Sequence, residues 1–315
     1  MTFPLPWRLV FMGTPDFAVP TLQALLAGPD QVVGVFTQPD KPVGRGLKMT
    51  FSPVKSQVVS LNIPIFQPTR LRHPEAVAQL RALAPDLVVV VAYGQILSQE
   101  VLDLPVHGCL NLHASLLPRW RGAAPLQRAL LAGDKESGVT IMKMDAGLDT
   151  GAMLTQKKII IPTGMTGGAL HDCLAPLGAQ LLLETIAKLK TDSIVATPQP
   201  EVGVTYAHKI ANEEGKIDWN QEARVIWRQI LAFNPYPGAY TTVDNKTCKI
   251  WQSRLLEHTS AQVLPGSVLA LHDDGPEVAC GGGSLVLTQI QMAGKRSMPA
   301  RDWMRGVSLE NKIFM

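Results

Sequence analysis

The chain has 315 residues, of which 46% are hydrophobic and 17% charged, so it is long and apolar enough to bury a sizeable core and is not a disordered polymer. The net charge of +3 is too small to identify a nucleic-acid-binding protein by itself. No apolar run approaches the roughly 18 residues of a membrane span. The four cysteines form no CxxC pair, and no signal or transit peptide pattern opens the chain, so we expect a cytoplasmic protein without zinc or disulfides.

The first half of the chain alternates short apolar runs with helical stretches. The apolar runs predict strands over 8–13, 31–37, 86–92, 108–113 and 138–144. The periodic stretches predict helices over 17–27, 74–84, 123–131 and 166–189. Continuous apolar strands that alternate with helices are typical of a mostly parallel sheet covered on both faces. The fold class is therefore α/β.

The amino-acid composition changes after residue 189. The segment 190–207 is poor in large apolar groups and carries prolines and glycine, which is typical of a linker. Beyond it, short β-rich segments over 239–243, 247–251, 266–271, 277–280 and 284–288 predict a small barrel, OB-like in its strand number. We therefore predict a catalytic domain over 1–189, a linker over 190–207 and a C-terminal domain over 208–315.

The turn after the first strand argues against a nucleotide cofactor. The segment Met12-Gly-Thr-Pro-Asp-Phe17 has a single glycine where a dinucleotide-binding fold needs GxGxxG. The P-loop pattern GxxxxGK[ST] is also missing from the chain. We therefore expect neither a nicotinamide enzyme nor a P-loop NTPase.

The densest polar constellation begins where a predicted strand ends. Asn111 and His113 are two residues apart on that strand, so their side chains point to the same face. An amide and an imidazole at the carboxyl end of a strand can donate hydrogen bonds to an oxyanion as it forms. The alternative is a structural role, in which Asn111 caps the next loop and His113 is a core histidine. The neighbouring Pro/Gly/Arg-rich loop favours the catalytic interpretation.

A second polar cluster, Asp145-Ala-Gly-Leu-Asp-Thr-Gly151, follows the next strand, so we expect it to open on the same edge of the sheet. Asp149 placed beside His113 could hold the imidazole protonated or accept a proton. It could equally be a loop-shaping aspartate, and Asp145 is its nearest competitor. Ser115 lies in no GxSxG elbow, so a covalent serine mechanism is weakly supported. The residues predict acyl-type transfer without a metal.

The segment Asn111-x-His113-x-Ser115-Leu-Leu-Pro118 closely resembles the folate-dependent formyltransferases. The resemblance narrows to the branch of that family that formylates methionyl-tRNA, on blocks spread over nearly the whole chain. These blocks are Phe11-Met-Gly-Thr-Pro-Asp-Phe17, Phe36-Thr-Gln-Pro-Asp-Lys-Pro-Val-Gly-Arg-Gly46, Ser115 to Gln127, Gly138-Val-Thr-Ile-Met142 with Asp145 to Gly151, Ala232-Phe-Asn-Pro-Tyr-Pro-Gly238, and Ala293-Gly-Lys295.

The resemblance implies an activity and a set of partners. The activity is transfer of a formyl group from 10-formyltetrahydrofolate to the α-amino group of methionine on initiator tRNA. The implied fold is a Rossmann-like domain joined to an OB-like domain, with no metal, no nicotinamide, no membrane contact and no obligate protein partner.

The resemblance also implies which residues form the site. Its catalytic set is Asn111, His113 and Asp149. The folate contacts are Ser115, Leu116, Leu117 and Pro118, with the loop 93–97 at the pterin. A loop carrying Lys41, Arg45 and Lys48 would contact the tRNA.

Three other functions stay open at this point. An amino-sugar formyltransferase would share the catalytic trio, but the β-rich C-terminal domain and the basic loop argue against it. A formyltetrahydrofolate hydrolase would need similar groups and differ in its acceptor. A tRNA-binding protein without activity would not need Asn111, His113 and Asp149 together.

Overall fold

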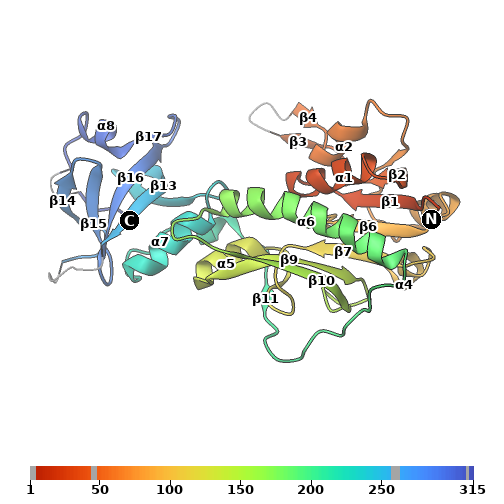
Figure 1. Cartoon of the computed structure of the whole chain (residues 1–315). Helices are drawn as coiled ribbons and strands as arrows, with labels where there is room; N and C mark the ends of the chain where they lie inside the picture. Colours follow the sequence, from red (N-terminus) through yellow and green to blue (C-terminus); the bar gives the residue numbers. More distant parts are fainter. Residues whose placement is uncertain (1–4, 44–47, 257–262, 310–311) are drawn as a thin grey trace. The chain divides into compact units, whose positions relative to one another are not determined.

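The computed structural model describes residues 5–43, 48–256, 263–309 and 312–315, which form two compact units (Figure 1). The first unit comprises residues 1–125, 136–160 and 171–207, and the second comprises 126–135, 161–170 and 208–315. The predicted division into 1–189, 190–207 and 208–315 stays a prediction. No helix in the described ranges is both long and apolar enough to cross a bilayer.

The first unit is built on a seven-stranded sheet in the order β10-β9-β7-β6-β1-β2-β5. The strands from β7 to β5 are parallel, whereas β9 is antiparallel to both β7 and β10. The prediction of a mostly parallel α/β sheet is therefore confirmed. The strands are β1 (Arg8–Gly13), β2 (Gln31–Phe36), β5 (Ile65–Phe66), β6 (Leu87–Val91), β7 (Cys109–His113), β9 (Glu136–Lys143) and β10 (Met153–Ile160).

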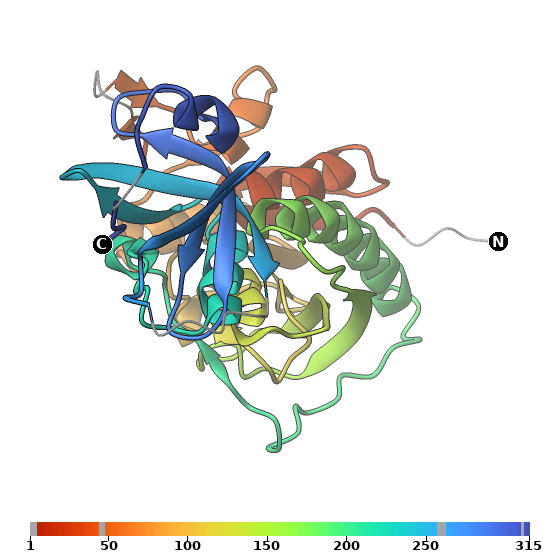
Figure 2. The same cartoon turned by 90° about the vertical axis from the view of Figure 1, so that its left-hand side faces the viewer.

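Helices cover both faces of this sheet. One face packs against α1 (Val19–Leu26) and α6 (Gly167–Leu189), which lie side by side in Figures 1 and 2, and Gly178 of α6 lies directly against Leu112 of β7. The opposite face packs against α3 (Pro74–Ala82) and α4 (Gln99–Leu102) through a core that includes Val88 and Cys109. Because strand side chains alternate, Asn111 and His113 lie on the face of Cys109.

Shorter elements lie beyond the carboxyl ends of the parallel strands. After β2, the chain forms the antiparallel hairpin β3 (Lys41–Val43) and β4 (Lys48–Thr50), and then α2 (Pro53–Val58), whose first turn is capped by Ser52 accepting from Lys55 N at 3.0 Å. Further along, β8 (Arg121–Gly122) pairs in parallel with β11 (Tyr206–Ala207). The 3-10 turn η1 (Asp16–Ala18) also belongs to this unit, whereas α5 (Pro125–Ala132) belongs to the second unit from residue 126 onward.

The second unit is an antiparallel sheet in the order β12-β13-β16-β15-β14, with β17 paired to β16 (Figure 2). The predicted β-rich C-terminal domain is thereby confirmed. Its elements are η2 (Asn212–Gly215), α7 (Ala223–Ala232), β12 (Ala239–Val243), β13 (Lys246–Leu256), β14 (Val268–His272), β15 (Gly275–Ala279), β16 (Ser284–Met292), β17 (Met298–Pro299) and α8 (Ala300–Met304).

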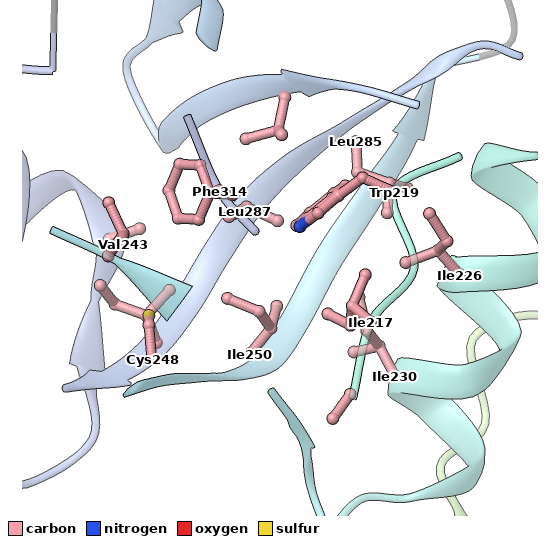
Figure 3. Packing of buried hydrophobic residues seen from close by; sticks show 14 of the residues in the cluster. Ile217, Trp219, Ile226, Ile230, Val243, Cys248, Ile250, Leu285, Leu287 and Phe314 are labelled. Carbon is pink, nitrogen blue, oxygen red and sulfur yellow. The ribbon is translucent and has the colours of Figure 1, made fainter. Parts of the chain in front are cut away.

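The core of the second unit forms where α7 and the late part of the chain meet the sheet (Figure 3). Trp219 lies at its centre, and the indole Nε1 donates to Thr241 Oγ1 at 2.9 Å, so its one polar atom is satisfied inside the core. Phe314 packs beside Trp219, with ring centroids 5.9 Å apart. Met315 exchanges two backbone hydrogen bonds with Thr242 of β12. Residues 314–315 are thus built into the sheet and its core.

Candidate active site

Two polar side chains are buried at the carboxyl end of β7. Asn111 is 8% and His113 5% exposed, on a strand that is otherwise apolar and fully buried. Buried polar groups at such a position need partners, since an unpaired one costs about 1–3 kcal/mol. The groups that bind these two side chains come from two loops. The first group is Asp149, in the loop that follows β9.

The structure brings Asp149 to these two side chains. Its Oδ1 accepts a hydrogen bond from Asn111 Nδ2 at 3.2 Å, and its Oδ2 lies 3.6 Å from His113 Nδ1. Oδ2 also accepts from the backbone N–H of Gly122 at 2.7 Å. The three predicted catalytic residues therefore form one cluster, although they are separated by up to 38 positions in the sequence. Asp145, by contrast, accepts from Gly147 N and Thr150 Oγ1 within its own loop.

The loop that carries Asp149 does not start at the sheet edge that the sequence predicted. β9 is antiparallel to β7, and Met142 lies opposite Asn111, so β9 ends at the amino end of β7 rather than at its carboxyl end. The expectation that both loops open from the same strand ends is wrong. The loop 144–152 instead turns back alongside β7 and brings Asp149 to Asn111, with Asp149 in the left-handed region at φ +52°.

The ring of His113 is fixed by a backbone oxygen. Its Nε2 lies 2.8 Å from the carbonyl oxygen of Trp120, and a carbonyl only accepts, so Nε2 carries a proton. Nδ1 is then the nitrogen that faces Asp149. Trp120 itself has φ +64°, a conformation that is strained for an aromatic residue. Two left-handed residues other than glycine, Trp120 and Asp149, therefore hold the ring from its two sides.

The segment Ser115–Pro118 is held rigidly by its own hydrogen bonds. Ser115 Oγ donates to the carbonyl oxygen of Arg119 at 2.6 Å, and Gln156 Nε2 donates to that of Leu117 at 2.8 Å. Thr140 Oγ1 donates to the Ser115 carbonyl and accepts from Leu117 N. The Ser115 hydroxyl thus serves the backbone, and no basic side chain activates it among the described contacts. Such a segment presents a fixed surface to a ligand, with Leu116 and Pro118 as its less buried members.

The basic loop predicted to meet RNA is a short hairpin. Lys41 begins β3 and Lys48 begins β4, and both side chains are exposed, whereas Arg45 lies outside the described residues. The neighbouring Asp40 is engaged by Lys55 Nζ at 2.5 Å, and this hydrogen bond, with one from Gln67, holds the pKa of Asp40 below its usual value. Asp40 is therefore paired with Lys55, and within the described part of the chain neither Lys41 nor Lys48 forms an ion pair.

The basic residues that follow β7 in the sequence have partners. Arg128 makes a bidentate pair with Glu214, at 2.7 and 3.1 Å. Arg119 lies over the Trp120 ring, 4.3 Å from its centroid. Arg121 donates from Nε and Nη2 to Gln199 Oε1. Gln199 falls in the predicted linker, where nothing in the sequence marks it, and it is the residue at this site that sequence reasoning missed.

Other reactive groups of the first unit do not extend the cluster. Cys109 lies two residues before Asn111 on the same face, but burial raises the pKa of its thiol to about 12, so it stays protonated. Among the residues that the structure describes, no three His, Cys, Asp or Glu side chains are grouped as a metal site would require. The cluster of amide, imidazole and carboxylate is thus the chemistry that this edge of the sheet offers.

An α/β sheet that carries an amide, an imidazole and a carboxylate at a strand end, followed by a β-rich unit, defines a group-transfer enzyme of the acyl type. The chain belongs to the formyl transferase family: residues 7–186 match the formyl transferase model, and residues 209–308 match the formyl transferase C-terminal domain. The predicted membership is thereby confirmed.

Relatives in sequence share nearly the whole chain. A methionyl-tRNA formyltransferase of Magnetococcus marinus is 56% identical over 95% of each chain. One of Hydrogenovibrio crunogenus is 49% identical over 98% of this chain and 99% of its own.

Solved structures share the fold. The sugar 3N-formyltransferase WlaRD superposes with a TM-score of 0.68 at 21% identity, over 92% of this chain and 99% of its own. HypX from Aquifex aeolicus superposes with a TM-score of 0.61 at 18% identity, over 96% of this chain and 48% of its own.

Proposed function

We propose that the protein transfers a formyl group from 10-formyltetrahydrofolate to the α-amino group of methionyl-tRNA, giving N-formylmethionyl-tRNA for translation initiation in the cytoplasm. The observation that carries the proposal is the 56% identity to a methionyl-tRNA formyltransferase, which extends over 95% of both chains and so includes the second unit. The cluster of Asn111, His113 and Asp149 supplies the chemistry that such a transfer needs.

The chemistry begins when the neutral amine attacks the formyl carbon. A carbon–nitrogen bond forms, and the formyl oxygen becomes an oxyanion. Asn111 Nδ2 has a second N–H beyond the one given to Asp149, and His113 offers Nδ1 because Trp120 occupies Nε2. Both groups donate to the oxyanion in our proposal. Nδ1 donates when both ring nitrogens carry a proton, and Asp149 Oδ2, 3.6 Å away, then faces the positive charge of the ring.

The tetrahedral adduct then collapses. The amine loses a proton, which the Asp149 carboxylate accepts directly or through water, and the bond between the formyl carbon and N10 of the folate breaks. N10 takes up a proton and tetrahydrofolate leaves. The reaction is complete without a metal or a redox step, and it needs only donors fixed before the charge develops.

We assign the binding of the two substrates to different parts of the first unit. The rigid segment Ser115–Pro118, which follows Asn111 and His113 of β7 in the chain, would contact the folate. The hairpin residues Lys41 and Lys48, with Arg45, would contact the phosphates of the tRNA. The exposed positive charges of Lys41 and Lys48, beside an Asp40 that is paired with Lys55, support this assignment.

The hairpin assignment predicts a salt-dependent defect. Lys41→Ala combined with Lys48→Ala should raise the KM for methionyl-tRNA and lower the slope of log KM against log salt by about 2, because each lost phosphate contact removes about 0.9 from that slope. Arg45→Ala should raise the same KM. Lys157→Ala with Lys158→Ala, which removes two exposed charges from β10, is the matched control and should change neither quantity. If the hairpin variants bound folate more weakly and kept the wild-type kinetics with tRNA, the assignment of the hairpin to the tRNA would be wrong.

The proposed acceptor is tested by a competition assay. The purified protein and 10-formyltetrahydrofolate are given methionyl initiator tRNA and a nucleotide-linked amino sugar in one mixture, and both formylated products are counted. We expect formyl groups on the tRNA alone. Formylation of the sugar would favour the amino-sugar transferase, which is the function of WlaRD.

A further inference from the structure

The side chain of Gln199 connects two parts of the catalytic cluster. Its Nε2 donates to the carbonyl oxygens of Asp149 at 2.7 Å and Gly151 at 2.9 Å. Its Oε1 accepts from Arg121 Nε at 3.0 Å and Nη2 at 2.7 Å. We propose that Gln199 is a positioning residue that fixes the loop of Asp149 in the geometry required for transfer. This inference rests on the proposed function.

The hydrogen bonds fix the orientation of the amide. Arg121 can only donate, and the two carbonyls can only accept, so the oxygen of Gln199 must face Arg121 and its nitrogen must face the loop. With the amide turned over, every one of these contacts would oppose two donors or two acceptors. A glutamine therefore satisfies a demand that neither glutamate nor an apolar side chain of the same size can meet.

The loop needs such a brace because its geometry is strained. Asp149 has φ +52°, a conformation that costs energy outside glycine and persists only where the surroundings impose it. Two residues further on, a side chain at Gly151 would lie 1.7 Å from the carbonyl oxygen of Lys143, so the loop passes very close to the end of β9. The bonds from Gln199 to residues 149 and 151 span the strained stretch.

The same segment of chain also holds the other side of the cluster. Thr205 Oγ1 accepts from the backbone N–H of Trp120 at 2.9 Å, and the Thr205 carbonyl accepts from Arg121 N at 2.9 Å. Trp120 supplies the carbonyl that fixes His113. Residues 199–205 thus contact both Asp149 and the partner of His113, which makes this segment part of the site rather than a passive connection.

A purely structural alternative is that Gln199 only accommodates Arg121. Arg121 is 9% exposed, and Gln199 accepts hydrogen bonds from its Nε and Nη2. The two roles make opposite predictions for Gln199→Glu. A carboxylate would bind Arg121 more strongly than an amide does, but it would repel the carbonyl oxygens of Asp149 and Gly151.

The test compares Gln199→Glu, Gln199→Met and the control Gln180→Glu, an exposed glutamine of α6. We expect both Gln199 variants to lower kcat about 10²-fold, as a misplacement of about 1 Å does. The KM values for folate and tRNA should stay within about threefold, and the control should match the wild type. The amide signal of Gly122, whose N–H donates to Asp149, should shift in the NMR spectra of both Gln199 variants and not in the control.

Three results would overturn the proposal: wild-type kcat in both Gln199 variants, loss in Gln199→Met with full activity in Gln199→Glu, or an unshifted Gly122 signal in a variant that has lost activity. The NMR readout needs no substrate, so it separates this inference from the proposed function. A wild-type protein that fails to formylate methionyl-tRNA while Gly122 still shifts in the variants would refute the function alone.

Discussion

Alanine in place of Asn111, His113 or Asp149 is expected to lower kcat of formyl transfer by about 10²–10³ for each residue, the usual effect of removing one donor to an oxyanion. Asn111→Ala and His113→Ala each remove a hydrogen bond that forms only as negative charge develops on the formyl oxygen. Asp149→Ala removes the carboxylate beside the imidazole ring. Because the three side chains act as a unit, the triple variant should be little worse than the worst single one. Rapid-quench kinetics at saturating substrates gives the required rate.

The control for this series is His73→Ala, which removes an exposed imidazole at the start of α3. It should keep the wild-type rate. The affinity for methionyl-tRNA, measured by filter binding, should stay within about twofold in all the variants, since none of the three side chains is assigned to the tRNA. A tRNA affinity that falls in parallel with kcat would contradict the roles given to the cluster.

Phe314→Ala is expected to destabilise the second unit by about 3–5 kcal/mol, as truncation of a buried aromatic residue generally does. Phe314 is 1% exposed and packs between Trp219 and Trp303, with ring centroids 5.9 and 6.3 Å away. The cavity left behind would lie within the core shown in Figure 3. Urea denaturation followed by tryptophan fluorescence measures the loss.

Ile313→Ala is the matched control for Phe314. Ile313 is the neighbouring residue and is 38% exposed, so Ile313→Ala should lower the free energy of unfolding by less than about 1 kcal/mol. If both variants lost the same free energy of unfolding, the backbone hydrogen bonds of residues 313–315, and not the packing of Phe314, would be what fixes this segment.

Much of the fold was predictable because its signals are local. The apolar runs at β1, β2, β6 and β7 and the long period of α6 can be recognised within about 10–20 residues of sequence, and their continuous burial indicates a covered sheet. The same reasoning found Asn111 and His113, since alternation along a strand places both on one face.

The direction of β9 could not be obtained from this kind of pattern. A buried apolar run has the same composition whether the strand is parallel or antiparallel to its neighbour. Several elements also went unpredicted, among them β10 and α7. β10 alternates weakly, with lysines on an exposed edge, and α7 is a ten-residue helix in a region that is otherwise β-rich.

The support of the catalytic cluster was hidden for a different reason. Gln199 lies 78 positions from Arg121 and 50 from Asp149, and the segment that carries it has the composition of a linker. The left-handed backbone of Trp120 is likewise imposed by its surroundings, since an aromatic residue does not favour it. Contacts of this kind depend on the folded chain and leave no periodic trace in the sequence.

The central claim is that this site moves the formyl group from the folate to the methionyl amine. It is tested most directly by a single-turnover experiment with a formyl-labelled donor, in which the enzyme is in excess and methionyl initiator tRNA is saturating. The label is then divided between formylmethionyl-tRNA and free formate. We predict that the label lost from the donor appears on the methionyl amine. Release of the label as formate, with none on the tRNA, would show that water is the acceptor and would contradict the account.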